Sequence, residues 1–325
     1  MDIVWRNRTL NNNQDKKDIF ILLGPTGIGK TKLSLALAKQ MTNIEIISAD
    51  SMQIYKYMDI GTDKPDKTIL STLKHHMIDI IKPDEHFDVS KYCQMASQVI
   101  LDILKREKIP LMVGGSGLYF SSMISPLFSG PGKDLKFRRI LGKLEKNRGI
   151  NHLYEKLSNI DPDSAKKIHH NDLQRIIRAL EVYEITGKTM TLLRKESKEK
   201  KRQFNFRIFG FLKNREDIYK QINARVDRMI EKGLIDEVKF LRDMGYREHL
   251  NAMQGLGYKQ INKYLNHEYD KDIAVERIKI DTRHYAKRQM TWFKNKINGI
   301  DWFDLDQLKE NEIISKIKKK ISEAY

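Results

Sequence analysis

The N-terminal part of the chain alternates between short apolar runs and segments whose apolar residues recur at helical spacing. The apolar runs span residues 19–23, 44–48 and 110–113, and each has the length of a strand. Helical spacing marks residues 30–40, after the first run, and residues 89–106, before the last. Short buried strands that alternate with helices are typical of a parallel sheet with crossover helices. The pattern predicts a doubly wound α/β core.

The pattern changes near residue 125, where a boundary is marked by Pro126, Gly130, Pro131 and Gly132. Longer helical segments rich in Lys and Arg follow at residues 135–148, 150–158, 164–168 and 173–186. The charged run 194–202 is interpreted as a solvated loop, with an RNA backbone contact as the alternative. Residues 206–212 are apolar again and predict a strand that returns to the core. We therefore expect an all-helical insertion, residues 125–204, within an α/β core of residues 1–124 and 205–325.

A phosphate-binding sequence follows the first predicted strand directly. It matches G-x-x-x-x-G-K-[ST] at Gly24, Pro25, Thr26, Gly27, Ile28, Gly29, Lys30 and Thr31. The glycines let backbone N–H groups turn toward phosphate oxygens, and the helix N-terminus that follows adds a partial positive charge. Lys30 supplies a mobile cation, and the Thr31 hydroxyl is placed to ligate Mg²⁺ on the same phosphates. The context predicts a phosphate site, and a glycine turn without a ligand is the alternative.

Polar clusters also follow the other two predicted strands. One consists of Asp50, Ser51, Met52 and Gln53, and the other has Ser116 among three glycines. Ligands of parallel sheets bind at the carboxyl ends of strands, so these clusters and the phosphate loop should converge in one crevice. Asp50 can ligate Mg²⁺ through water or accept a proton there, with a helix N-cap as the structural alternative. We interpret the glycines as sites of close approach to a ligand, and Ser116 as a hydrogen-bond partner of an amine or phosphate.

Charge points to a polyanionic partner. The chain has 325 residues, with 60 Lys and Arg against 43 Asp and Glu, a net charge of +17 and a pI near 9.6. Such an excess attracts polyanions, so nucleic acid is the favoured large partner, although a generally lysine-rich composition would give the same excess. Gln174, Arg175 and Arg178 share one face of the predicted helix 173–186, and Gln and Arg read base edges and phosphates. An ordinary surface salt bridge is the alternative for this face.

Residues 283–293 interleave cations with aromatic side chains. This combination suits contact with a nucleic-acid backbone together with base stacking. Alternatively Tyr285, Trp292 and Phe293 belong to the core side of an amphipathic helix.

Composition also bears on location. No apolar run approaches the roughly 20 residues that cross a bilayer, and residues 1–17 contain no apolar signal-peptide core. Cys93 is the single cysteine, which excludes an internal disulfide and a multi-cysteine zinc site. We interpret it as a buried small apolar residue. These features predict a cytoplasmic protein without a membrane partner.

The motifs taken together resemble the tRNA dimethylallyltransferase family. In chain order, from residue 24 to residue 293, they read GPTGIGKT, DSMQIYKYMDIGTDKP, DVSKY, VGGSGLYF, IHHNDLQRIIRALEVYEITGK, GLGYK and RHYAKRQMTWF. The ordered set covers nearly the whole chain and is far more specific than a phosphate loop alone. Two positions depart from the usual family sequence: Gly27-Ile28 replaces Ala-Ser, and Ser116 replaces a Thr. The zinc finger of eukaryotic relatives is absent from the sequence, which fits the bacterial type.

The resemblance implies a P-loop fold with Mg²⁺ as the cofactor. The implied reaction moves a dimethylallyl group from dimethylallyl diphosphate to the exocyclic N6 amine of the adenosine just 3′ of a tRNA anticodon. By the same resemblance, Lys30, Mg²⁺ bound by Thr31, and Arg225 stabilise the leaving diphosphate. Asp50 accepts the proton of the amine, so that Asp50, Ser116 and Lys30 form the implied catalytic set.

The resemblance also implies which residues contact tRNA. Ser116 and Arg138 match positions that contact the target nucleotide. The remaining contacts fall on Asp50, Ser51, Met52, Gln53, Gln174, Arg175, Ile176, Ile177 and Arg178. The target base must leave its stack to enter the pocket, at a cost of a few kcal/mol. We expect the helical insertion to grip the anticodon stem-loop and the protein to act as a monomer.

Three other functions share parts of this pattern. A P-loop kinase of small molecules would use the same cradle but would not need the basic helical insertion. An adenylate isopentenyltransferase shares the donor chemistry and acts on free AMP. An RNA-binding ATPase is the third, and the sequence lacks a strand that ends in a second carboxylate poised for water activation. The charge of +17 and the face formed by Gln174 to Arg178 favour tRNA over free AMP.

Overall fold

The computed structural model describes residues 17–125, 130–198 and 204–325. The chain divides into two compact units, one made of Met1–Ser121 and Gln203–Tyr325 and the other of Ser122–Arg202. The insertion expected at 125–204 corresponds to this second, helical unit. The N-terminal residues 1–16, Pro126 and the end of the charged run 194–202 lie outside the described residues.

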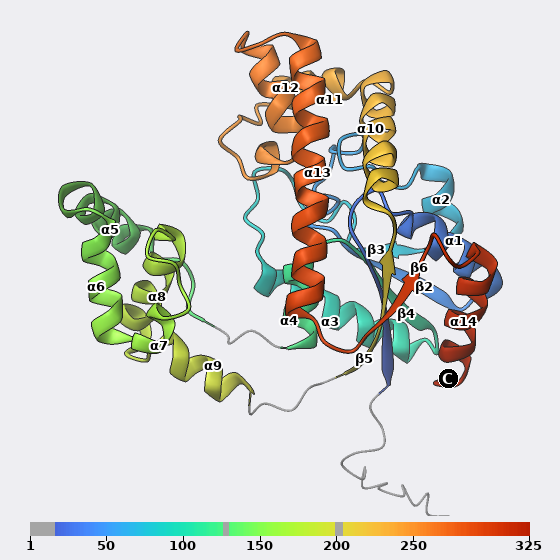
Figure 1. The fold of residues 1–325 in the computed structure, drawn as a ribbon, viewed down its shortest axis with the longest axis horizontal. Coiled ribbons are helices and arrows are strands. Elements are labelled where there is room, and N and C mark those ends of the chain that lie inside the picture. Colours follow the sequence, from blue (N-terminus) through green and yellow to red (C-terminus); the bar gives the residue numbers. More distant parts are fainter. Residues whose placement is uncertain (1–16, 126–129, 199–203) are drawn as a thin grey trace, which may run out of the picture. The chain divides into compact units, whose positions relative to one another are not determined.

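A six-stranded sheet forms the centre of the first unit, in the order β3-β2-β4-β1-β5-β6 with every pairing parallel. Figure 1 shows the strands, which are β1 (Asp18–Leu23), β2 (Ile44–Ala49), β3 (His75–His76), β4 (Ile109–Gly114), β5 (Asn205–Leu212) and β6 (Ile300–Asp304). The α/β fold with a parallel sheet is confirmed. The sequence did not predict β3 and β6, because both are short edge strands without a continuous apolar run.

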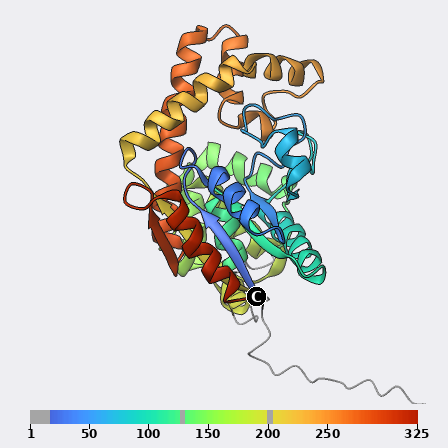
Figure 2. The same ribbon diagram turned by 90° about the vertical axis from the view of Figure 1, so that its right-hand side faces the viewer.

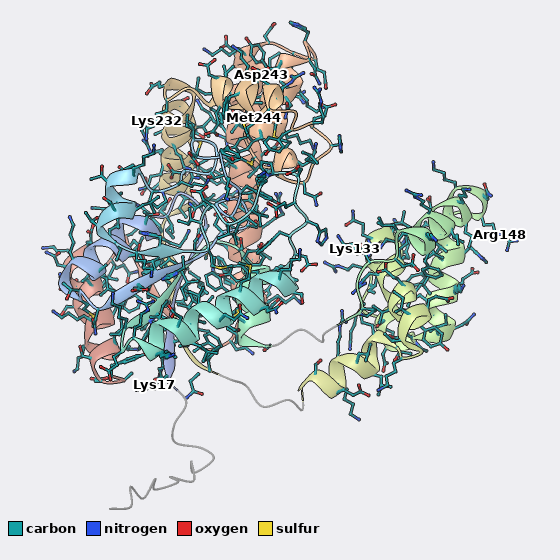
Figure 3. All side chains as sticks on the ribbon, turned by 180° about the vertical axis from the view of Figure 1, so that it is seen from behind. Lys17, Lys133, Arg148, Lys232, Asp243 and Met244 are labelled. Carbon is teal, nitrogen blue, oxygen red and sulfur yellow. The ribbon has the colours of Figure 1, made fainter. Side chains whose placement is uncertain are left out.

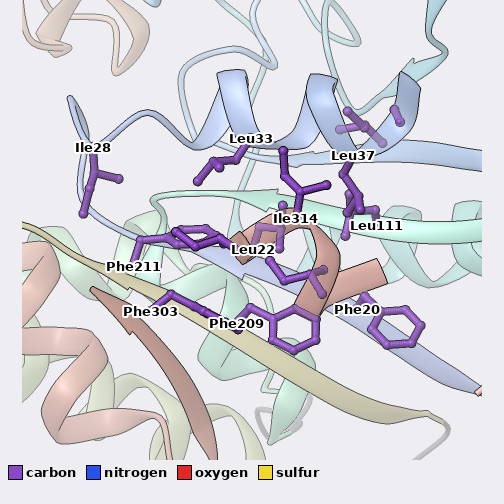
Figure 4. Packing of buried hydrophobic residues seen from close by; sticks show 14 of the residues in the cluster. Phe20, Leu22, Ile28, Leu33, Leu37, Leu111, Phe209, Phe211, Phe303 and Ile314 are labelled. Atoms are coloured by element: carbon purple, nitrogen blue, oxygen red, sulfur yellow. The ribbon is translucent and has the colours of Figure 1, made fainter. Parts of the chain in front are cut away.

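Helices α1 (Lys30–Gln40) and α14 (Glu310–Ser322) pack against each other and against one face of the sheet. Their core residues meet those of the strands, as Figure 4 shows for Leu33, Leu37, Leu111, Phe209 and Ile314. Right-handed crossovers that run in opposite directions across a sheet lie on opposite faces. The crossover through α3 (Val89–Lys105) runs opposite to that of α1, so α3 covers the other face (Figure 2).

Cys93 lies on α3 and is half-buried rather than buried as predicted. Burial raises the pKa of its thiol to about 11, so the reactive thiolate is scarce at neutral pH.

A second layer of helices follows β5. It consists of α10 (Arg215–Glu231), α11 (Leu234–Asp243), η1 (Ala252–Gln254), α12 (Tyr258–Leu265) and α13 (Lys271–Lys296). Helices α10 and α13 run side by side (Figure 1), and α13 also contacts α12. Their apolar faces share a core with the segment after β2, through residues such as Met58, Val226 and Tyr258. This core holds the segment after β2 against the helices. The shorter α2 (Lys67–Thr72) precedes β3, and α4 (Gly117–Ile124) follows β4.

The second unit contains α5 (Leu135–Arg148), α6 (Ile150–Ile160), α7 (Pro162–Ala165), α8 (Leu173–Thr186) and α9 (Met190–Lys198). Leu153, Leu157 and Ile176 are fully buried in its core. Residues 194–198 belong to α9, so the prediction of a solvated loop is wrong for them: two apolar residues, Met190 and Leu193, pack this helix against the core. None of the helices in the described ranges of either unit is both long and apolar enough to cross a membrane.

Glu181 ties the helical unit together from a fully buried position on α8. Its carboxylate accepts hydrogen bonds from Arg138 Nε at 2.6 Å, from Arg178 Nη1 at 2.5 Å and from the backbone N–H of Asp134 at 2.9 Å. Burial opposes ionisation of the carboxyl, but these hydrogen bonds outweigh it and lower the pKa of Glu181 to about 2. Arg138 and Arg178 are therefore held in place before any ligand binds.

Replacing Glu181 by Gln is expected to destabilise the helical unit by about 2 kcal/mol, because charge-assisted hydrogen bonds to a buried carboxylate are lost. The folded pKa lies below the unfolded value, so this stabilisation is present at neutral pH and disappears as the pH falls toward about 2. Hydrogen exchange of the amides of α5 and α8 in the full chain measures the effect. Glu184→Gln, on the exposed side of the same helix, serves as the control. Equal protection in both variants would contradict the prediction.

Candidate active site

The polar segments that follow β1, β2 and β4 line one cavity of about 660 Å³ in the first unit. The pairing register explains why they meet: Gly114 at the end of β4 is level with Leu23 on one side and Ala49 on the other. The predicted convergence at the carboxyl edge of the sheet is therefore confirmed. Helices α10 and α13 close the cavity with side chains that include Arg225, Thr282, Tyr285 and Gln289.

The phosphate loop turns sharply between β1 and α1. Gly27 and Gly29 have φ values of 79° and 97°, in the left-handed region that glycine tolerates. At Gly27 a Cβ would also meet Ile222 Cγ1 at 2.8 Å, so a larger residue would push against α10. Gly29 directly precedes the first turn of α1. Gly29, Lys30 and Thr31 line the cavity, so the N–H groups of this first turn, which have no partner within the helix, are available to an anion there.

Lys30 is held by the loop from which it extends. Its Nζ donates hydrogen bonds to the carbonyl oxygens of Gly24 and Pro25, both at 2.9 Å. Burial lowers the pKa of the Lys30 ammonium to about 7, with Asp50 opposing the shift and Arg225 adding to it. In the free protein the Lys30 ammonium is therefore bound to two carbonyl oxygens and loses its proton near neutral pH. The sequence had predicted a mobile cation without these contacts.

Affinity for inorganic diphosphate is expected to fall as the pH rises through about 7. Below this pH the Lys30 amine is protonated and carries its charge. Above it Lys30 is neutral in the free protein, so binding of the anion requires Lys30 to take up a proton. The loss is at most about tenfold per pH unit, with uptake of up to one proton on binding. Calorimetry in buffers of different ionisation enthalpy measures both quantities. Lys30→Met separates this effect from titration of diphosphate itself, and an unchanged pH profile in that variant would refute the assignment.

Arg225 on α10 lies beside the phosphate loop. Its Nη1 donates a hydrogen bond to Thr26 Oγ1 at 2.9 Å and is 3.4 Å from Asp63 Oδ2. Asp63 has a φ of 52° and belongs to the loop of residues 58–65. The fold thus brings a second cation to the phosphate loop. This agrees with the diphosphate contact that the family resemblance implied for Arg225. Asp63 was not identified from the sequence, because only the folded chain brings it near Arg225.

Asp50 follows the last residue of β2 and stabilises the turn after it. Its Oδ1 accepts hydrogen bonds from the backbone N–H groups of Met52 at 2.8 Å and Gln53 at 3.3 Å. The structural alternative was a helix N-cap, but residues 51–54 form a turn rather than a helix, and these bonds occupy only one carboxylate oxygen. Within the described parts of the chain no hydrogen bond to Oδ2 is found. The carboxylate lines the same cavity as Lys30 and Tyr285, and its charge raises the pKa of both groups.

The glycines of the segment after β4 pack against protein atoms. Our interpretation that their missing side chains make room for a ligand is wrong, because the space that a Cβ would take is already occupied by protein. A Cβ at Gly114 would lie 2.2 Å from Ala49 O, one at Gly115 would lie 2.3 Å from Gln289 Nε2, and one at Gly117 would lie 2.4 Å from Trp292 Cδ1. The glycines let β2 and α13 approach the segment closely. Ser116 is buried, and its Oγ accepts a hydrogen bond from the N–H of Ser51 at 3.0 Å.

The loop of residues 58–65 forms another wall, and Glu237 on α11 fixes it. Glu237 accepts hydrogen bonds from the N–H groups of Asp59, Ile60 and Gly61 at 2.7–3.1 Å and from the Tyr258 hydroxyl at 2.6 Å. The Tyr258 ring packs on Gly61, where a Cβ would come within 2.5 Å of it. The GLGYK motif therefore supports this loop from behind.

Gln53 reaches the same loop from the other side. Its Nε2 donates hydrogen bonds to the carbonyl oxygens of Thr62 and Asp63, both at 3.3 Å. Gln53 and Met52 line the cavity, as does Ser51.

Helix α13 supplies cavity residues whose sequence pattern indicated only core or nucleic-acid contacts. Phe293 is fully buried, which confirms the core alternative for that residue, whereas Tyr285 and Trp292 are half-buried. Gln289 is buried and contacts both the phosphate loop and the segment after β4. It stands in the motif RHYAKRQMTWF, but no local signal distinguishes it from a surface glutamine.

The other predicted tRNA-binding residues belong to the helical unit. Gln174 and Arg175 are exposed on α8, and Arg175 forms an ion pair with Asp172 at 3.2 Å. Arg178 donates to Glu181 and, through Nη2, to the carbonyl oxygen of Pro131 at 2.8 Å. Arg138 shares Glu181, as described above. The surface of this unit is rich in basic side chains such as Lys133 and Arg148 (Figure 3).

Ile176 needs a correction. Its side chain is fully buried among the core residues of the helical unit, and the neighbouring Ile177 packs partly against the same core. A buried side chain cannot reach RNA, so Ile176 is a packing residue, while Gln174 and Arg175 on the same helix are exposed.

Comparison with known proteins identifies the family. The family model described as IPP transferase matches residues 53–296. The chain belongs to the IPP transferase family. It is 48% identical over 94% of its length to a protein of Halothermothrix orenii named tRNA dimethylallyltransferase, of which it covers 93%. A protein of the same name from Acetivibrio thermocellus is 47% identical, with 92% of this chain and 95% of that protein covered.

Solved structures of this IPP transferase family share the fold. The full-length tRNA isopentenylpyrophosphate transferase of Bacillus halodurans has a TM-score of 0.69 at 39% identity, covering 95% of this chain and 98% of that one. A eukaryotic dimethylallyltransferase described as acting on tRNA has a TM-score of 0.78 at 29% identity, over 94% and 80% of the two chains. The resemblance to this family inferred from the sequence motifs is confirmed.

Proposed function

We propose that this IPP transferase family member transfers a dimethylallyl group from dimethylallyl diphosphate to N6 of the adenosine just 3′ of a tRNA anticodon and releases diphosphate. The observation that carries the proposal is one cavity whose lining includes a phosphate loop, the cations Lys30 and Arg225, and the carboxylate of Asp50. The names of the relatives support the same reaction. An anion cradle beside a carboxylate suits an anionic leaving group on one side and a proton-bearing nucleophile on the other.

Lys30, Arg225 and the N–H groups at the start of α1 stabilise the diphosphate. As the bond between C1 of the dimethylallyl group and the diphosphate oxygen breaks, negative charge develops on that oxygen. Fixed donors that face this charge lower the barrier, because they need no reorientation during the reaction. Lys30 leaves its two carbonyl partners for the phosphate oxygens and regains a full charge there.

Asp50 serves the acceptor. The N6 amine forms the new bond to C1, and one of its protons passes to Oδ2 of Asp50 while Oδ1 keeps the turn in place. An exocyclic amine is a weak nucleophile, so its position relative to C1 contributes as much as the base does. Ser116 orients this region indirectly, since its hydroxyl holds Ser51 next to Asp50.

Mg²⁺ fits the same cavity. The Thr31 hydroxyl lies at the start of α1 and the Asp50 carboxylate lines the facing wall, and both are hard oxygen donors of the kind Mg²⁺ prefers. A bound Mg²⁺ would neutralise charge on the diphosphate. Among the described residues no group of three or more His, Cys, Asp or Glu side chains could hold a metal ion alone, so the substrate phosphates would complete the ligand set.

Charge favours tRNA over AMP or a small phosphoryl acceptor. The helical unit, Ser122–Arg202, contains 19 Lys and Arg against 10 Asp and Glu. A small acceptor needs no such surface, whereas an RNA stem-loop offers many phosphates to it. We therefore assign the grip on the anticodon stem-loop to this unit, with Gln174 and Arg175 exposed for it. Action as a cytoplasmic monomer is part of the same proposal.

The test uses labelled dimethylallyl diphosphate with Mg²⁺. It compares an anticodon stem-loop that has an unmodified adenosine 3′ of the anticodon with free AMP, and it includes ATP hydrolysis as a control. Label on the RNA alone supports the proposal. Label on AMP alone would show an adenylate isopentenyltransferase, and phosphate transfer from ATP without prenyl transfer would show a kinase.

A further inference from the structure

Gln289 bridges two parts of the cavity wall that are far apart in sequence. Its Oε1 accepts a hydrogen bond from the backbone N–H of Thr26 at 2.9 Å, and its Nε2 donates to the carbonyl oxygen of Gly115 at 2.8 Å. The side chain is 6% exposed, and a Cβ at Gly115 would lie 2.3 Å from Nε2. The carboxamide therefore fills the whole space between the phosphate loop and the segment after β4.

Only an amide satisfies both partners. An N–H group can only donate and a carbonyl oxygen can only accept, so the orientation of the Gln289 carboxamide follows from its neighbours. Glutamate would set a second acceptor against the Gly115 carbonyl, and leucine would leave both backbone groups without a partner. Gln289 thus fixes the spacing of Thr26 and Gly115 by two directed bonds.

A second branch leads from Gln289 toward Asp50. Tyr285 lies one turn earlier on α13, and its side chain interacts with those of Gln289 and Ser116. Ser116 in turn accepts the N–H of Ser51, the residue after Asp50. Burial, together with the charge of Asp50, raises the pKa of Tyr285 to about 12, so the phenol stays protonated at neutral pH.

We propose that Gln289 is a positioning residue that sets the distance between the diphosphate cradle and the acceptor side of the cavity. Thr26 lies on the donor side, where Arg225 also holds it, and the route through Tyr285 and Ser116 ends at the turn that carries Asp50. The reaction needs C1 of the donor and N6 of the acceptor in line and in contact. A displacement of about 1 Å between the two sides costs on the order of 100-fold in rate. This inference rests on the proposed prenyl transfer.

Gln289→Leu and Gln289→Glu test the proposal in the full-length protein. We expect the single-turnover rate of transfer to RNA to fall about 10- to 100-fold in Gln289→Leu. The KM for each substrate and the Kd for inorganic diphosphate with Mg²⁺ should change less than about threefold, because both ends of the Gln289 amide are bonded to Thr26 and Gly115 rather than directed at a ligand. Gln289→Glu keeps the acceptor for Thr26 and is nearly isosteric, so it remains informative if the leucine variant does not fold. Its transfer rate should also fall, again with little change in the KM values and in the Kd for diphosphate.

Thr291→Ala is the matched control, since Thr291 is exposed on the same helix and, within the described ranges, its hydroxyl donates one hydrogen bond, to the carbonyl of Lys287 at 3.0 Å. Wild-type rates in both Gln289 variants would overturn the inference. Weaker binding of inorganic diphosphate at an unchanged transfer rate would also overturn it, because Gln289 would then serve the cradle alone. Failure of the wild-type protein to prenylate RNA would instead remove the proposed function, which the same assay shows before any variant is compared.

Discussion

Asp50→Asn is expected to slow dimethylallyl transfer by about 10²- to 10⁴-fold, the usual contribution of a positioned general base. The amide is almost the same size as the carboxylate, and its oxygen can still accept the N–H of Met52, which Asp50 Oδ1 accepts at 2.8 Å. What the variant loses is the ability to take a proton at the second oxygen. Single-turnover transfer to the RNA stem-loop, with saturating donor, measures the effect.

Asp50→Ala distinguishes the chemical role from the structural one. Alanine removes both the base and the hydrogen bonds to Met52 and Gln53. If the base dominates, both variants lose activity to a similar extent. If Asp50 mainly stabilises the turn, Asn retains activity and only Ala loses it, and the assignment of Asp50 as the proton acceptor would be wrong.

Lys30→Met is expected to lower kcat/KM for the donor by about 10²- to 10³-fold, as removal of one fixed donor to a developing charge does elsewhere. Methionine retains most of the side-chain volume but supplies no charge to the leaving diphosphate. Most of the loss should appear in kcat, because the charge on the bridging oxygen is greatest in the transition state. Steady-state kinetics with varied dimethylallyl diphosphate at saturating RNA separates kcat from KM.

Lys32→Met is the control for net charge. Its Nζ is paired with Glu310 at 2.5 Å, and its side chain is 76% exposed. Lys32 also lines the cavity, two residues along the same helix, but its Nζ is held by Glu310. The variant therefore changes the protein charge by the same amount and leaves the contacts of Lys30 with the phosphate loop in place. Equal losses in the two variants would mean that the overall field, rather than a contact to the diphosphate, explains the effect of Lys30.

Several site features could be predicted from the sequence because they depend on neighbours along the chain. The limits of α1, α5 and α8 followed from helical periodicity, and the phosphate loop followed from the spacing of Gly24, Gly29 and Lys30. Convergence at one cavity followed from a general property of parallel sheets, whose strand ends align at one edge. The weak edge strands β3 and β6 escaped prediction, since their residues lack the apolar run that marks a central strand.

The sequence by itself determined the fold class, the family, the phosphate loop and the positive charge, because each depends on residue types and on their spacing over short stretches of the chain. Only the tertiary structure decided what surrounds those residues. It showed that the glycines near Ser116 make room for Ala49, Gln289 and Trp292, and that Arg138 and Arg178 share the buried Glu181. Gln289 contacts Thr26 across 263 residues of sequence. A contact of that kind depends on how distant elements pack, and packing leaves no local period by which the sequence could reveal it.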